Sequence, residues 1–184
     1  MKHSMLTCVL LAGATLMASP ARADRDGDRE TFHARLSGFN EVGALNAETG
    51  AILSDGTATA DVELDRRAGT ATYALTFSGL SAAVTQAHIH FGKNHVPGGV
   101  MVFFCSNLGN GPAGTPACPA SGTVTGSWTA ASVVAIPGQN VTAGDFDALT
   151  DALGSNTAYA NVHTTKFPAG EIRDQMRRSR DDHD

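Results

Sequence analysis

The chain consists mainly of short stretches in which apolar and polar side chains alternate. Residues 32–36 alternate in this way, and residues 57–64 and 70–77 do so on either side of a four-residue connection that ends in Gly69. A period of two predicts strands with one buried face. A short connection containing glycine predicts that the second and third of these strands form a hairpin.

Five further strands are predicted along the rest of the chain. In the segment 84–91, Val84, His88 and His90 are separated by even numbers of positions, so a regular strand places them on one face. The run 100–104 is apolar throughout and favours a buried strand. The five segments are residues 84–91, 100–104, 122–130, 157–163 and 170–176.

One short helix is predicted between the last strands. Phe146, Leu149 and Leu153 form one apolar stripe, residues 142–145 resemble a capping box, and Gly154 is a natural stop. Several short strands and one helix predict an all-β fold, an antiparallel Greek-key-like β-sandwich with one short helix.

The N-terminus has the pattern of a secretory signal peptide. Residues 1–23 combine a cationic start, the apolar run 5–17 and a small-x-small ending, which predicts cleavage after Ala23. The apolar run is too short for a membrane span. The protein is therefore expected to be secreted or periplasmic.

Charge and composition exclude two further classes. The 184 residues carry a net charge of −5, with 42% hydrophobic and 17% charged residues. Removal of Lys2 and Arg22 leaves 13 − 2 = 11 basic against 18 acidic residues, a net charge of −7. This balance argues against a nucleic-acid binder, and the apolar content argues against a disordered polyelectrolyte. The charged segments 24–30 and 177–184 are expected to be tails of a single domain, residues 31–176.

Two cysteines remain after the predicted cleavage. Cys105 and Cys118 enclose a loop rich in Gly, Pro and Asn, and in an exported chain they most simply form a disulfide. A pair of metal-binding thiolates is less well supported because no histidine lies near them in the sequence.

The histidines provide the candidate chemistry. His88 and His90 should present two imidazoles side by side, and His163, on another predicted strand, could complete a three-nitrogen metal site. Copper suits such a set best, with zinc as second choice. His95 follows the pair in a loop and is a further candidate ligand. The alternative is a polar strand face whose histidines only form hydrogen bonds.

Three other polar residues could support this site. Glu171 and Arg173 should share one strand face, where they could pair with each other or orient a histidine. Asn161 should lie on the same face as His163. We found no motif of a hydrolase, a phosphate-binding loop or a dinucleotide site, so no catalytic residue is assigned.

At these residues the chain resembles the CHRD (chordin-type) domain family. It departs from the family pattern at Gly43-Ala44, where prolines are usual, and at Asp174, where glycine is usual. The resemblance implies an extracellular all-β domain without known enzymatic activity. It rests on Phe32-x-Ala-x-Leu36, Asn40-Glu41-Val42, Ala87-His-Ile-His-x-Gly92, Gly98-x-Val-Met-Val102, the helix start Gly144-Asp-Phe146, and Tyr159-Ala-Asn-Val-His163 continuing to Gly170-Glu-Ile-Arg173.

A weaker, local similarity is to copper–zinc superoxide dismutases. It rests on His88-x-His90 followed by Gly92, on Val162-His163, and loosely on Arg173. In that family the corresponding histidines bind copper and the arginine guides the anionic substrate.

Three functions follow as hypotheses. The first is an exported, non-catalytic protein that binds copper or zinc through His88, His90 and His163. The second is an extracellular interaction or matrix module, with an unknown protein partner and no metal. The third is a copper-dependent oxidoreductase of the dismutase type, although a net charge of −7 opposes the approach of superoxide.

Overall fold

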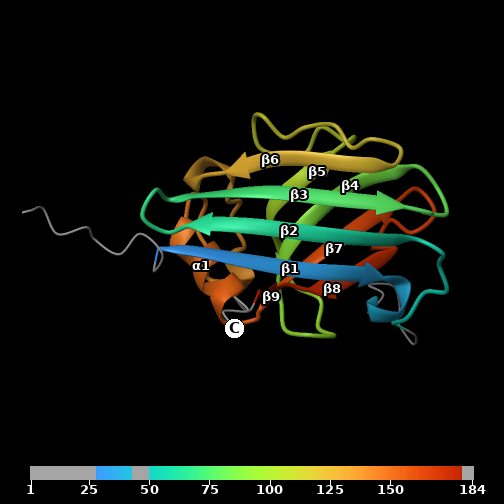
Figure 1. The fold of residues 1–184 in the computed structure, drawn as a ribbon, viewed down its shortest axis with the longest axis horizontal. Coiled ribbons are helices and arrows are strands. Elements are labelled where there is room, and N and C mark those ends of the chain that lie inside the picture. Colours follow the sequence, from blue (N-terminus) through green and yellow to red (C-terminus); the bar gives the residue numbers. More distant parts are fainter. Residues whose placement is uncertain (1–27, 43–49, 180–184) are drawn as a thin grey trace, which may run out of the picture.

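The fold is an antiparallel sheet wrapped into two layers, with one short helix at an end (Figure 1). This computed structural model describes residues 28–42 and 50–179. The predicted signal peptide, residues 1–23, lies outside the described residues. Within the described part, the strands are β1 (Arg29–Ser37), β2 (Thr57–Asp65), β3 (Thr70–Ser78), β4 (Val84–Phe91), β5 (Gly99–Ser106), β6 (Gly122–Trp128), β7 (Ala158–Thr164), β8 (Ile172–Gln175) and β9 (Arg177–Arg178). The helical elements are α1 (Phe146–Gly154) and three 3₁₀ turns, η1 (Gly38–Asn40), η2 (Ala130–Ser132) and η3 (Pro137–Gln139).

The strand order is β5-β4-β7-β8-β1-β2-β3-β6, and β9 pairs with β1. In Figure 1, β1, β2, β3 and β6 form one layer, and β4, β5, β7 and β8 cross behind it. One residue pair, Ser37 with Arg173, joins β1 to β8. At the other end, Trp128 of β6 donates a 2.7 Å hydrogen bond to the carbonyl oxygen of Phe103 on β5. The predicted antiparallel sandwich is thus confirmed, and its two layers belong to one sheet that is nearly closed into a barrel-like shape.

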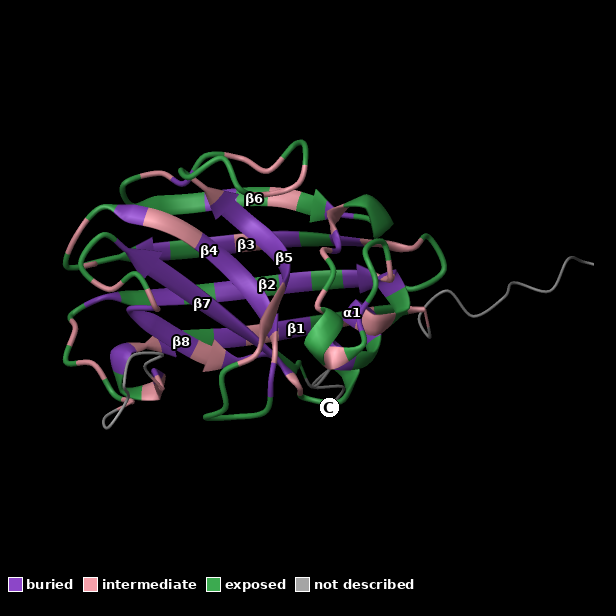
Figure 2. Ribbon diagram, turned by 180° about the vertical axis from the view of Figure 1, so that it is seen from behind, coloured by how far each residue is buried: buried purple, intermediate pink, exposed green. Residues whose placement is uncertain are grey.

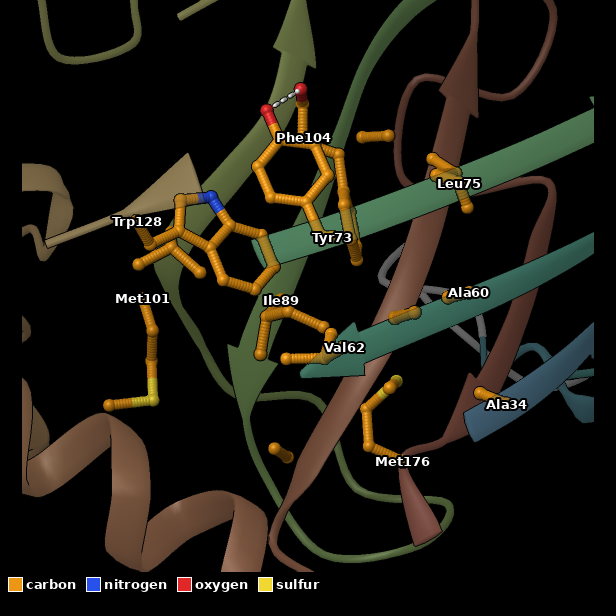
Figure 3. Packing of buried hydrophobic residues seen from close by; sticks show 14 of the residues in the cluster. Ala34, Ala60, Val62, Tyr73, Leu75, Ile89, Met101, Phe104, Trp128 and Met176 are labelled. Carbon is orange, nitrogen blue, oxygen red and sulfur yellow. Dashed lines mark hydrogen bonds between the residues drawn. The ribbon is translucent and has the colours of Figure 1, made fainter. Parts of the chain in front are cut away.

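The core lies between the two layers. β2 and β3 alternate strictly between buried and partly or fully exposed residues, because their second face meets solvent (Figure 2). Trp128 stacks on Tyr73 with ring centroids 4.5 Å apart, and Phe104 packs against both rings (Figure 3). The hydroxyl of Tyr73 donates to the carbonyl oxygen of Phe104 at 2.8 Å. This aromatic group therefore joins β3 and β6 to β5.

The predicted disulfide between Cys105 and Cys118 is confirmed, with a Cα–Cα distance of 5.0 Å. It closes the loop after β5. On the chain-entropy view, a loop of this length contributes about 3 kcal/mol to the free energy of unfolding.

Strands extend into both segments that were expected to be charged tails. Arg29 and Glu30 belong to β1, and Arg177–Arg178 form β9, although both segments were expected to lie in charged tails. The reason is charge pairing. The Glu30 carboxylate accepts a hydrogen bond from Nε of Arg66 and forms an ion pair with Arg178, each at 2.6 Å. Residues 180–184 lie outside the described part.

Two further boundaries differ from the prediction. The helix is capped by Asp145, whose side chain accepts from the Ala148 amide at 2.9 Å, so the Thr142 capping box was wrong. Gly170 and Glu171 precede β8 and are not part of it, because the backbone turns at Gly170 with a φ of 131°, which favours glycine. No helix in the described ranges is long and apolar enough to cross a membrane.

Candidate metal centre

The three histidines lie on the two neighbouring strands β4 and β7. Gln86 of β4 pairs with His163 of β7, and His88 pairs with Asn161. His88, His90 and His163 therefore lie on one face, and the alternate residues, such as Ile89, join the hydrophobic core. The structure thus brings the predicted histidines together.

Val84 does not share that face, contrary to the prediction. It is part of the hydrophobic core. The register of β4 against β7 shifts between Val84 and Gln86, and such a bulge reverses the alternation of side chains.

The histidine face is buried although it is opposite the core. His88, His90 and His163 are 2%, 9% and 6% exposed, and every residue of β7 is buried (Figure 2). The ring of Phe103 on β5 meets His88 edge-on, with centroids 4.4 Å apart. These imidazoles are therefore removed from water.

Backbone carbonyls fix the orientation of two of the rings. Nδ1 of His90 lies 2.9 Å from the carbonyl oxygen of Gly98, and Nδ1 of His163 lies 3.0 Å from that of Pro168. A carbonyl only accepts, so Nδ1 carries the proton in both rings and Nε2 keeps its lone pair. A proton on Nδ1 bonded to a carbonyl is a frequent support of histidines that bind metal through Nε2.

The remaining ring nitrogens form a polar group without partners. The Nε2 atoms of His88, His90 and His163, and Nδ1 of His88, are buried and form no hydrogen bond with any described residue. Buried polar atoms of this kind are rare in folded proteins and call for an explanation such as a bound ion.

One nitrogen from each ring can be chosen so that all three lie within 4.8 Å of one another. Around a single ion at about 2.0–2.1 Å, three nitrogens would be about 3.3–3.6 Å apart. The site is therefore somewhat wider than a metal-bound one, and closing it needs ring movements of about 1 Å.

The surroundings hold all three imidazoles neutral. Burial, together with the neighbouring His163 and His90, lowers the pKa of His88 to about 2. Burial lowers the pKa of His90 to about 3, and it also lowers the pKa of His163. Neutral imidazole is the form that binds metal ions.

Glu171 and Arg173 do not pair with each other. Glu171 accepts from Ser54, Thr164 and the Ser81 amide, at 2.6–2.8 Å, and these hydrogen bonds lower its pKa although burial acts to raise it. Its contacts place it beside the loop that follows His163 rather than on a histidine.

Asn161 and Arg173 also have partners other than the histidines. Asn161 donates to the Glu41 carboxylate at 2.6 Å and to the carbonyl oxygen of Ile172. Burial raises the pKa of Glu41. Arg173 lies over the ring of Tyr159, which in turn stacks on His90. Arg173 is therefore linked to His90 through the ring of Tyr159.

His95 lies apart from the three-histidine group. It is exposed, in the loop between β4 and β5, with a φ of 59°. The group that could hold a metal consists of His88, His90 and His163 in the described ranges.

Three contacts of the site were not foreseen: Phe103 against His88, Tyr159 against His90, and the Gly98 carbonyl. Phe103 and Tyr159 lie directly opposite those histidines on neighbouring strands. The signal for them is therefore the strand register, which no local pattern in the sequence reveals.

Comparison with known families supports the resemblance found in the sequence. A CHRD domain is matched over residues 32–176, which is most of the chain. The chain belongs to the CHRD-domain family. No curated protein and no solved structure matches this CHRD-domain chain, so the local similarity to copper–zinc superoxide dismutases has no support.

Proposed function

We propose that this CHRD-domain protein binds one copper or zinc ion through His88, His90 and His163, outside the cytoplasm and without catalysis. The proposal is carried by three buried imidazoles, each of which offers a nitrogen within 4.8 Å of the others. Their Nε2 atoms have no hydrogen-bond partner in the described part of the chain. An ion would satisfy nitrogens that otherwise remain desolvated at a cost.

The donor set supports copper or zinc over other ions. Three neutral imidazoles suit copper and zinc, whereas magnesium and calcium prefer oxygen ligands. The carbonyls of Gly98 and Pro168 would hold His90 and His163 with Nε2 toward the ion. Export is supported by the Cys105–Cys118 disulfide, which is typical of oxidising compartments, and by the signal peptide pattern.

The proposal predicts uptake of one ion per chain. Protein stripped with a chelator is dialysed against zinc or copper, and its metal content is measured. Wild-type protein should retain one equivalent, and His88→Ala and His163→Ala should each lose at least about tenfold in affinity.

The matched control is His95→Ala, which changes an exposed histidine outside the group. It should retain one equivalent. A wild-type protein without stoichiometric uptake of either metal would refute the proposal, and so would His88→Ala protein that binds as well as wild type.

A further inference from the structure

The loop between β4 and β5, residues 92–98, is tied to the side chains around His90. Nη2 of Arg173 donates to the carbonyl oxygens of Val96 and Lys93, at 2.9 and 3.2 Å. Nε2 of Gln175 donates to the carbonyl oxygen of Gly92 at 3.0 Å. β8 therefore holds both halves of this loop through side chains.

Gly98, at the end of the same loop, fixes the orientation of the His90 ring and the nitrogen that carries its proton. The Gly98 amide donates to the Tyr159 hydroxyl at 3.0 Å, and the Gly98 carbonyl lies 2.9 Å from Nδ1 of His90. A Cβ atom at Gly98 would overlap the carbonyl oxygen of Phe91, so the loop can close here only with glycine. A shift of Gly98 would therefore break contacts to Tyr159 and His90 together.

Arg173 connects these contacts into one stack. Its guanidinium lies 3.4 Å from the centre of the Tyr159 ring, and the Tyr159 ring is parallel to His90 at 4.7 Å. A guanidinium over an aromatic face is favourable, and more so when both are shielded from water. The order Arg173, Tyr159, His90 crosses from β8 through β7 to β4.

Arg173 is an unusual residue to bury at this place. It is 2% exposed, yet none of the ion pairs within residues 28–42 and 50–179 includes it. Burying an arginine outside ion-pair distance of a carboxylate is costly. The charges of Glu41 and Asp174 offset part of this cost, and the direct contacts of the guanidinium are the loop carbonyls and the Tyr159 ring. The side-chain hydrogen bonds of Arg173 thus go to the loop, and its guanidinium covers the ring that stacks on His90.

We infer that Arg173 is a positioning residue of the metal centre. Through loop 92–98 and Tyr159 it holds His90 with Nδ1 on the Gly98 carbonyl and Nε2 toward the other two imidazoles. It thereby limits how fast a bound ion leaves. The effect on the ion rests on the proposed function, whereas the effect on the loop and on His90 does not.

The experiment compares Arg173→Met, which keeps the length of the side chain but removes its charge and donors, with wild type. In metal-free protein, hydrogen exchange of the Gly98 amide should accelerate at least about tenfold, and the ¹⁵N shifts of His90 should report a mixture of tautomers. In zinc-loaded protein, zinc transfer to a chelator should also accelerate at least about tenfold.

Two variants control for general damage. Arg35→Met removes an exposed arginine of β1 and should leave all three measurements unchanged. Arg173→Lys keeps a charge but not the flat guanidinium, so its rates should fall between wild type and Arg173→Met. If Arg173→Met does not fold, Arg173→Lys decides by the same measurements.

The outcomes separate the two proposals. The inference would be overturned if, in the folded Arg173 variant, the Gly98 amide exchanges as slowly as in wild type and His90 keeps a single tautomer. Absence of zinc binding by wild-type protein would instead overturn the proposed function, and the metal-free measurements would still decide the role of Arg173 in holding the loop and His90.

Discussion

The metal-free protein is expected to lose about 3 kcal/mol of unfolding free energy per pH unit below about pH 6.5, from His88 and His90 alone. Their pKa values are about 2 and about 3 in the folded protein, and an unfolded chain restores them to about 6.5. Above about pH 6.5 the imidazoles of His88 and His90 are neutral in the folded and in the unfolded protein, so they do not lower the free energy of unfolding. Below it only the unfolded state takes up protons, so stability falls until the folded pKa values are approached.

Urea unfolding of chelator-treated protein between about pH 7 and pH 5 measures this slope. Because carboxylates also titrate in acid, the informative quantity is the difference between wild type and His88→Leu. That variant should flatten the slope by about 1.4 kcal/mol per pH unit. An unchanged slope in His88→Leu would contradict a neutral buried imidazole.

Replacement of Trp128 by alanine is expected to lower the free energy of unfolding by about 3–5 kcal/mol. The side chain is 2% exposed, stacks on Tyr73 and donates to the Phe103 carbonyl oxygen between β6 and β5. Its loss leaves a cavity and an unpaired carbonyl at the place where the two ends of the sheet meet.

Urea unfolding at neutral pH tests this expectation. Trp128→Phe keeps an aromatic ring but loses the donor, so its loss should be smaller than that of Trp128→Ala. Phe39→Ala removes a ring that is 68% exposed and should change stability by less than about 0.5 kcal/mol. A Trp128→Ala protein within about 1 kcal/mol of wild type would contradict the role given to this contact.

The strands and the histidine face were predictable because their signals are local. Alternation in residues 57–65 and 70–78 survives in the structure since one face of β2 and β3 meets solvent. His88 and His90 lie on one face, as their even spacing predicted, because both belong to the strand β4. The disulfide was predictable because only two cysteines remain after the expected cleavage.

The remaining features depend on contacts between distant segments. Val84 changes face because of a bulge, and Arg173 reaches His90 through Tyr159 because of the register of β7 between β4 and β8. Glu30 orders the N-terminal end of β1 by pairing with arginines far along the chain. No local pattern encodes these pairings.

Anomalous diffraction from crystals grown with zinc tests the metal centre most directly. The account predicts one peak per chain at the zinc edge, about 2.0–2.1 Å from one ring nitrogen of each of His88, His90 and His163. Saturating zinc with no peak among these three rings, or with peaks only at exposed groups such as His95, would contradict it.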